Sequence, residues 1–329
     1  MSEEELPRPR WSGAFAWYLE NVDPEPIPLR FYELRPPKSR AEANLSSLEN
    51  LYAAVPRSLE IWRDGDETKI VFGCEDTSPL VFYRRTYPGI EISPAKETEP
   101  SFVRSITDEH PPIAFDVELN HGLPFVRYAR SFDLMNNLIS ALEPGNWIQI
   151  VFSAWDWTNY AETVGMRMGN LAEVMRQLAP GSTMATIGPE IAREFLEKSH
   201  GIPIILHIRG LLLRPNQTLA TVLSNIKMDY DNAFPIAYDD PSFIRWLRTR
   251  AIPDPERFLE ILADAFSSDG VRPWGKGREF IPVFCLTSSE LPIFTHMPTE
   301  PSLPVKFAGV GGPSRVRGAR GKTDARIAR

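Results

Sequence analysis

A glycine-containing segment at residues 270–277 is the strongest candidate for chemistry in this sequence. It reads Gly-Val-Arg-Pro-Trp-Gly-Lys-Gly, which has the GxxxxGK spacing of a phosphate-cradling loop. Gly277 stands where a serine or threonine hydroxyl would hold magnesium, and Pro273 removes one amide donor. The residues that follow predict a strand, whereas a phosphate loop opens a helix. We therefore interpret the run as a basic turn.

A second candidate is a group of acidic residues in one segment: Asp229, Asp231, Asp239 and Asp240. Carboxylates hold a divalent cation when a rigid scaffold makes their oxygens converge. We interpret this segment as a solvated loop, and the alternative is a divergent metal-dependent enzyme acting on nucleic acid. The histidines are scattered, and Cys74 and Cys285 have no CxxC partner. The sequence predicts no catalytic residue, no cofactor and no metal site.

Two further features are candidates for contact with a partner or with nucleic acid. Trp155 and Trp157 alternate at the end of an expected strand, where an exposed ring could stack on a base or a partner side chain. The alternative is packing beneath a helical insertion. A basic C-terminal tail could follow phosphates through Arg315, Arg317, Arg320, Lys322 and Arg326. The alternative for the tail is a solubilising terminus.

Composition limits the class of protein. The chain has 329 residues, 43% of them apolar, a net charge of -7 and a pI near 5.4. This acidic balance argues against general coating of nucleic acid or anionic lipid. The two cysteines fit a reducing compartment, and the acidic N-terminus lacks the pattern of an export signal. We expect a soluble cytoplasmic protein without a membrane span.

The first part of the chain predicts alternating strands and helices. Asp64, Gly65 and Asp66 supply hairpin chemistry between two β-favouring runs. The expected elements are a strand at 29–34, a helix through residue 55 that begins at a Ser39–Glu42 capping box, strands at 58–62 and 68–72, a helix at 78–83 and a strand at 90–93. This order, βαββαβ, is typical of the split ferredoxin-like sandwich.

The second part repeats this pattern with an insertion. Its expected elements are strands at 113–119 and 123–127, a helix at 132–142, a strand at 147–152, a helical insertion, a strand at 202–213, a helix at 255–266 and a strand at 280–285. The second helix of the insertion is expected to start at Gly188 and Pro189.

The expected fold class is α+β, with two ferredoxin-like units of which the second carries the helical insertion. The expected divisions are an N-terminal arm at 1–27, a ferredoxin-like unit at 28–95, a linker at 96–111, an elaborated α/β unit at 112–299 and a disordered Gly/Arg-rich tail at 300–329.

Several segments carry a resemblance to a known family. The segments are Glu33-Leu34-Arg35-Pro36-Pro37, Ser58-Leu59-Glu60-Ile61, Tyr87-Pro88-Gly89-Ile90-Glu91-Ile92, Trp147-Ile148-Gln149-Ile150 and, the most specific, the run from Ser288 to Thr299 with Glu290, His296 and Thr299. Together they resemble the N-terminal, non-motor region of the conjugative-transfer ATPases of type IV secretion systems, the TraC-type members of the HerA/FtsK superfamily. The resemblance covers roughly residues 28–299.

The resemblance implies a motorless accessory or docking module of a DNA-transfer machine. The chain has no Walker A motif, no acidic Walker B strand and no arginine finger to carry over, so it implies no ATPase activity. Its implied partners are a translocation motor ATPase or other subunits of the machine. Contact with DNA through the tail, and association with the inner face of the membrane through partners, would follow. A stand-alone binding protein of ferredoxin-like topology is a further alternative.

Overall fold

A computed structural model describes residues 25–38, 44–106, 112–119, 125, 133–226, 233–238, 242–252, 254–256, 259–260 and 283–309. The first part of the chain forms β1 (Arg30–Arg35), the 3-10 helix η1 (Leu45–Asn50), β2 (Arg57–Asp64), β3 (Glu67–Cys74), α2 (Leu80–Thr86), β4 (Glu91–Pro94) and the 3-10 helix η2 (Ser101–Ser105). The second part forms β5 (Ile113–Leu119), α3 (Leu134–Ala141), β6 (Asn146–Ala154), α4 (Thr158–Leu178), α5 (Thr183–Lys198), β7 (Pro203–Leu212), α6 (Gln217–Ser224), β8 (Ala233–Tyr238), α7 (Ser242–Thr249), β9 (Phe284–Thr287) and α9 (Leu291–Thr295).

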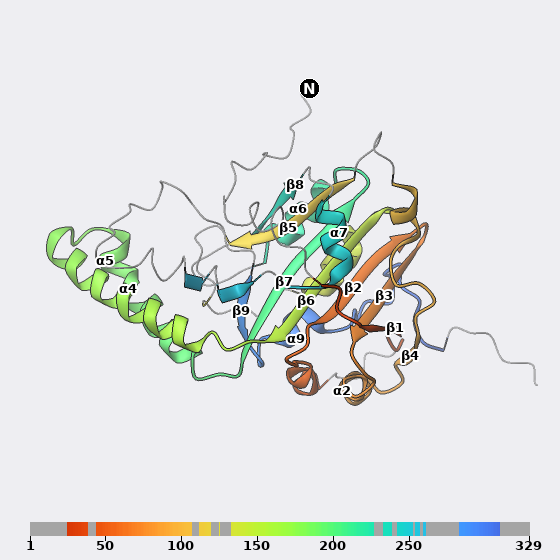
Figure 1. The fold of residues 1–329 in the computed structure, drawn as a ribbon, viewed down its shortest axis with the longest axis horizontal. Coiled ribbons are helices and arrows are strands. Elements are labelled where there is room, and N and C mark those ends of the chain that lie inside the picture. Colours follow the sequence, from red (N-terminus) through yellow and green to blue (C-terminus); the bar gives the residue numbers. More distant parts are fainter. Residues whose placement is uncertain are drawn as a thin grey trace, which may run out of the picture.

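These strands belong to one nine-stranded sheet, in the order β4-β1-β3-β2-β6-β7-β5-β8, with β9 paired to β7 (Figure 1). Every ladder between the strands of the described ranges is antiparallel. The two parts of the chain meet where β2 pairs with β6, in a register that sets Leu59 opposite Ile150 and Glu60 opposite Gln149. The α+β class expected from the sequence is therefore confirmed, and the sheet runs through both parts.

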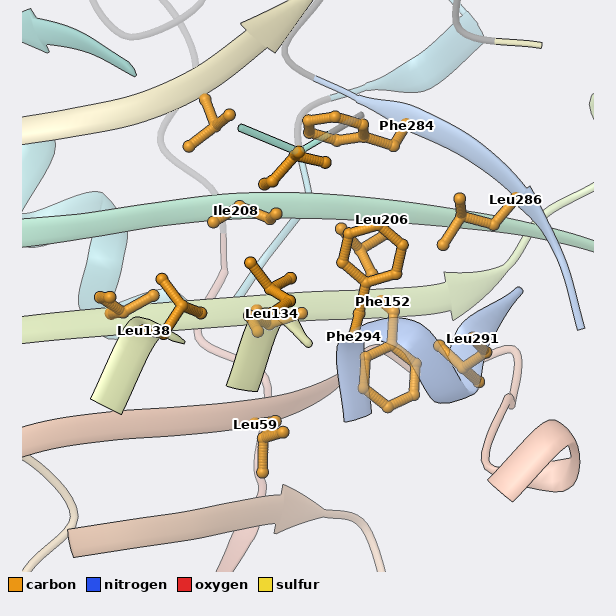
Figure 2. Packing of buried hydrophobic residues seen from close by; sticks show 14 of the residues in the cluster. Leu59, Leu134, Leu138, Phe152, Leu206, Ile208, Phe284, Leu286, Leu291 and Phe294 are labelled. Atoms are coloured by element: carbon orange, nitrogen blue, oxygen red, sulfur yellow. The ribbon is translucent and has the colours of Figure 1, made fainter. Parts of the chain in front are cut away.

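One face of the sheet is apolar and lies under a layer of helices. In that layer α2 contacts η1, η1 contacts α9, α9 contacts α3 and α3 contacts α6. Leu134 and Leu138 of α3, with Leu291 and Phe294 of α9, lie over apolar side chains of the sheet such as Phe152 (Figure 2). The apolar side chains of the helices and those of this sheet face are buried against each other. Their removal from water stabilises the central strands.

The strand predictions are largely confirmed. Strands lie close to the predicted positions in both parts, and Gly65 makes the β2–β3 turn with a φ of 58°, which glycine adopts without steric cost. The capping box at Ser39 and the strand predicted at 123–127 fall on residues outside the described ranges, apart from Phe125. Residues 45–50 form a 3-10 helix capped by Asn44, where a longer helix was expected.

The predicted start of the second inserted helix is wrong. α5 begins at Thr183, because the Ser182 side chain accepts a hydrogen bond from the amide of Ala185 and caps the helix. Pro189 lies inside the helix and removes one amide donor. Packing of Ile191 and Phe195, which are 4% and 0% exposed, offsets that loss.

The segment 300–309, expected to begin the C-terminal tail, packs against the first part of the sheet. Val305 bridges to Thr68, whose amide donates to the Pro304 carbonyl at 2.6 Å. The amide of Ala308 donates to the Pro36 carbonyl at 2.8 Å. The tail boundary at residue 300 is therefore too early, and the chain is held to the sheet as far as Gly309.

Gly210 of β7 should be intolerant of any side chain. A Cβ atom there would lie 2.3 Å from the carbonyl oxygen of Trp147 and 2.6 Å from the ring of Phe115. We expect Gly210→Ala to lower the free energy of unfolding by about 3 kcal/mol, measured by urea denaturation. Gly181→Ala, where a Cβ meets nothing within 4 Å, is the control and should change it by less than about 0.5 kcal/mol. Equal effects would contradict the packing described for β7.

Candidate functional site

The most prominent surface feature is a helical hairpin, α4 and α5, which we call the arm (residues 158–198). It connects β6 to β7 and projects beyond the ends of these two strands (Figure 1). The two helices approach closely because small residues line their contact. A Cβ on Gly165 would lie 3.1 Å from the Ala192 carbonyl oxygen, and a Cβ on Gly188 would lie 3.0 Å from the Ala172 Cβ. Close packing of this kind makes the arm a paired element and not a loose loop.

The base of the arm is fixed by aromatic packing. Trp157 is fully buried, and its indole Nε1 donates to the Ile204 carbonyl at 3.0 Å. Its ring lies 5.5 Å from that of Phe125, which lies 5.3 Å from that of Phe195 in α5. The arm therefore leaves the sheet at a defined place.

A buried ion pair adds a second anchor at the base. Lys198 at the end of α5 lies 3.1 Å from the Glu290 carboxylate, and their side chains are 1% and 9% exposed. Glu290 also accepts from the amide of Thr287 at 2.8 Å. This pair ties the arm to β9 and α9, since a buried charge needs a partner that compensates for lost hydration.

The outward face of α4 carries exposed apolar side chains. Met166, Val174 and Leu178 are 58%, 49% and 77% exposed. Val174 and Leu178 are four residues apart and therefore adjoin on the helix surface, whereas Met166 lies about two turns earlier. Exposed apolar side chains that adjoin make a candidate contact surface. At the base, the half-buried Trp155 stacks on Tyr160 with ring centroids 5.8 Å apart.

The two tryptophans predicted as contact residues thus have different environments. Trp157 is inaccessible and packs beneath the arm, which was the alternative interpretation. Trp155 is half-buried. The other predicted contact residues lie outside the described ranges: Arg315, Arg317, Arg320, Lys322 and Arg326. The basic turn at 270–277 and the acidic residues Asp229, Asp231, Asp239 and Asp240 also lie outside them. Residues 233–238, between Asp231 and Asp239, form β8, so the interpretation of the whole segment as a loop is wrong there.

Neither cysteine is placed for nucleophilic chemistry. Cys74 and Cys285 are both buried, and burial raises the pKa of the Cys74 thiol to about 12. Burial likewise raises the pKa of the Cys285 thiol, more than the nearby Lys198 lowers it. A thiol with a raised pKa is a poor nucleophile at neutral pH. Among the described residues, no group of three or more His, Cys, Asp or Glu side chains could hold a metal ion.

A row of buried polar side chains crosses the other face of the sheet, and sequence reasoning missed it. The register of β2, β6, β7 and β5 places these residues side by side: Glu60, Gln149, Arg209 and Asp116. All four are 0% exposed. Each comes from a different strand, so only the strand pairing brings the row together, and no local motif signals it.

Glu60 lies at the β2 end of this polar row. Its carboxylate accepts from Trp147 Nε1 at 3.1 Å, from Gln149 Nε2 at 3.3 Å and from Arg250 Nε at 2.9 Å. Arg209 continues the row by donating from Nε to Gln149 Oε1 at 2.9 Å. The Glu60 carboxylate is therefore compensated within the interior by the Arg250 guanidinium, as a buried charge must be.

His207 lies in the same face, on β7. Its Nε2 is 3.6 Å from Asp116 Oδ2, and its ring packs 5.3 Å from that of Trp246. Burial, together with the charge of Arg209, holds the pKa of His207 well below its ordinary value. The imidazole is therefore neutral near pH 7, despite the neighbouring carboxylate.

The residues of the most specific family-like segment hold the C-terminal part of the fold. Glu290 pairs with Lys198, and His296 Nε2 lies 3.5 Å from Asp133 Oδ1. The Thr299 amide donates to Asn136 Oδ1 at 2.9 Å. These contacts fix the segment against α3 and the arm, which gives each residue a structural role.

No protein-family model matches the chain, and neither the search of curated proteins nor that of solved structures finds a match. Within the described ranges, none of the helices has the length and apolar character that crossing a membrane requires.

Removing one partner of the buried pair between Glu60 and Arg250 should strongly destabilise the fold. Glu60→Gln leaves Arg250 buried without its counter-charge, so we expect the free energy of unfolding to fall by about 3 kcal/mol in urea denaturation. Glu173→Gln breaks an exposed pair with Arg176 and serves as the matched control, with less than about 0.5 kcal/mol expected. A loss no larger than that of the control would contradict the role of Glu60.

His207 should make stability depend on pH. Because its pKa is lower in the folded chain than in the unfolded chain, the unfolded chain binds the extra proton first as pH falls. The free energy of unfolding should therefore decrease below pH of about 6.5, by up to about 1.4 kcal/mol per pH unit. His207→Gln should remove this part of the slope, whereas His200→Gln, at an exposed position, should keep it. Identical slopes in wild type and His207→Gln would contradict the buried neutral state.

Proposed function

We propose that this protein is a docking module that acts through protein–protein contacts, without chemistry of its own. The observation that carries the proposal is the arm, a rigid pair of helices that projects from the sheet and presents Met166, Val174 and Leu178 to solvent. Surfaces of this kind bind partners by burying apolar side chains at the centre of an interface.

The finer fold assignment belongs to the same proposal. We infer that the two parts are ferredoxin-like units, joined edge to edge through β2 and β6. In support, the sheet order reads fourth, first, third, second for the strands of the first part, and the order β8-β5-β7-β6 repeats this for the second part. The β2–β3 turn and the arm then occupy equivalent positions. In a ferredoxin-like unit a short turn is enough to join the strands at this position. The arm is accordingly an insertion into the second unit.

The partner class comes from the family resemblance, and the first candidate is a translocation motor ATPase of a conjugative DNA-transfer machine. The protein would then be a motorless accessory subunit in the cytoplasm, held near the inner face of the membrane by its partners. The basic residues after Gly309 would add DNA contact through counterion release. These assignments rest on the resemblance and on the charge of the tail.

Shortening the arm tests the proposal. Because Ala172 and Gly188 lie against each other, residues 173–187 can be replaced by a short Gly-Ser loop while Trp157, Phe195 and Lys198 stay in place. We expect retention of a co-expressed motor ATPase to fall at least about tenfold in pull-downs. The melting temperature of the shortened protein should stay that of the wild type, because the base of the arm is intact. Leu213→Ser, which alters an apolar residue away from the arm, is the control.

Full retention by the shortened arm would contradict docking through α4 and α5. A second version of the protein, ending at Gly309, tests the tail separately. It should lose salt-sensitive DNA retention while keeping the motor, because residues 301–309 that pack on the sheet remain.

A further inference from the structure

The polar row is covered by α7 and the residues that follow it, which we call the strap (residues 242–251). The strap lies across β7 on the side of the sheet opposite the helical layer (Figure 1). Arg209 holds it from below, with its guanidinium 3.8 Å from the centre of the Trp246 ring and Nη1 donating to the Ala251 carbonyl at 2.7 Å. The amide of Ile27 donates to the Thr249 carbonyl at 3.0 Å.

Arg250 fixes the end of the strap at a cost in backbone strain. Its φ is 56°, the only positive value among the non-glycine residues in the described ranges. Glycine usually occupies this conformation after a helix, since it has no Cβ to clash. The Arg250 side chain bonds to both oxygens of Glu60 and donates to the carbonyls of Arg248 and Thr98. The side-chain contacts of Arg250 hold its backbone in this unfavourable conformation. Strained residues of this kind cluster at functional sites, which makes the contact with Glu60 a candidate for a functional role.

The helical layer and the strap, which cover opposite faces of the sheet, differ in the free energy that their detachment would cost. Release of the helical layer would expose a wide apolar surface, including Leu134, Leu138 and Phe294. Release of the strap would expose Trp246 and Leu247, but it would also rehydrate Glu60 and Arg250. A buried ion pair gains back much of its hydration when both partners meet water. The strap is therefore the cover that detaches at the lower cost.

We propose that the strap is a releasable cover, latched by Arg250 on Glu60, whose opening uncovers the polar row without unfolding the sheet. Opening would present an acid, an amide and a guanidinium together at the junction of β2, β6 and β7. The inference does not depend on the docking function of the arm.

Native-state hydrogen exchange on the full chain tests the latch. Amides of 244–250 in the wild type should exchange through an opening distinct from that of α3 and α6, with at least about tenfold lower protection. Glu60→Gln and Arg250→Gly should each accelerate exchange in the strap at least about tenfold. Strap amides should keep the small denaturant dependence of a local opening, whereas α3 amides should show the larger dependence of global unfolding. Arg250→Gly is informative because glycine relieves the strained φ but removes the latch.

Each other outcome would overturn the proposal. If strap and α3 amides in the wild type exchange through one common opening, the strap has no separate release, and this measurement needs no variant to fold. If Arg250→Gly slows exchange or leaves it unchanged, the residue is only a strained helix end. If strap exchange in the variants shows the denaturant dependence of global unfolding, the strap opens only with the whole sheet, and Glu60 latches nothing.

Discussion

The antiparallel pairing of β2 with β6 is the contact on which the rest of the structure depends. It joins the two parts of the chain into one sheet, and it buries Glu60 in the middle of that sheet beside Gln149. A carboxylate placed there must be neutralised, which requires Arg250 to reach back across the polar face. The position of the strap follows from that requirement. The apolar face has no such constraint and is closed by ordinary helix packing.

The arm depends on the same sheet in a different way. It is inserted between β6 and β7, which form the longest strand pairing in the second part of the chain. Because these strands are held firmly, the base of the arm is held firmly as well. Trp157 and the Lys198–Glu290 pair transfer that rigidity to the helices. A projecting element with a fixed base can present side chains to a partner without first being ordered, which lowers the entropic cost of association.

Local patterns were enough to predict most strands, the turn at Gly65 and the presence of an inserted helical pair. They failed where a distant contact decides. The Gly188–Pro189 pair predicts a helix start, whereas Ser182 caps the helix and tertiary packing tolerates the proline. The polar row could not be predicted, because Glu60 and Arg209 become neighbours of Gln149 only through pairing of strands far apart in sequence. Trp155 and Trp157 alternate in sequence, but only their packing distinguishes the half-exposed ring from the buried one.

Site-specific photocross-linking from the arm tests the central claim most directly. A photoreactive amino acid at Leu178, 77% exposed near the tip of α4, and another at Leu213, 42% exposed away from the arm, would be compared in cells that express the motor ATPase. We expect a covalent adduct between position 178 and the motor, identified by mass, and none from position 213. An adduct from position 213 alone, or no motor adduct from position 178, would contradict docking through the arm.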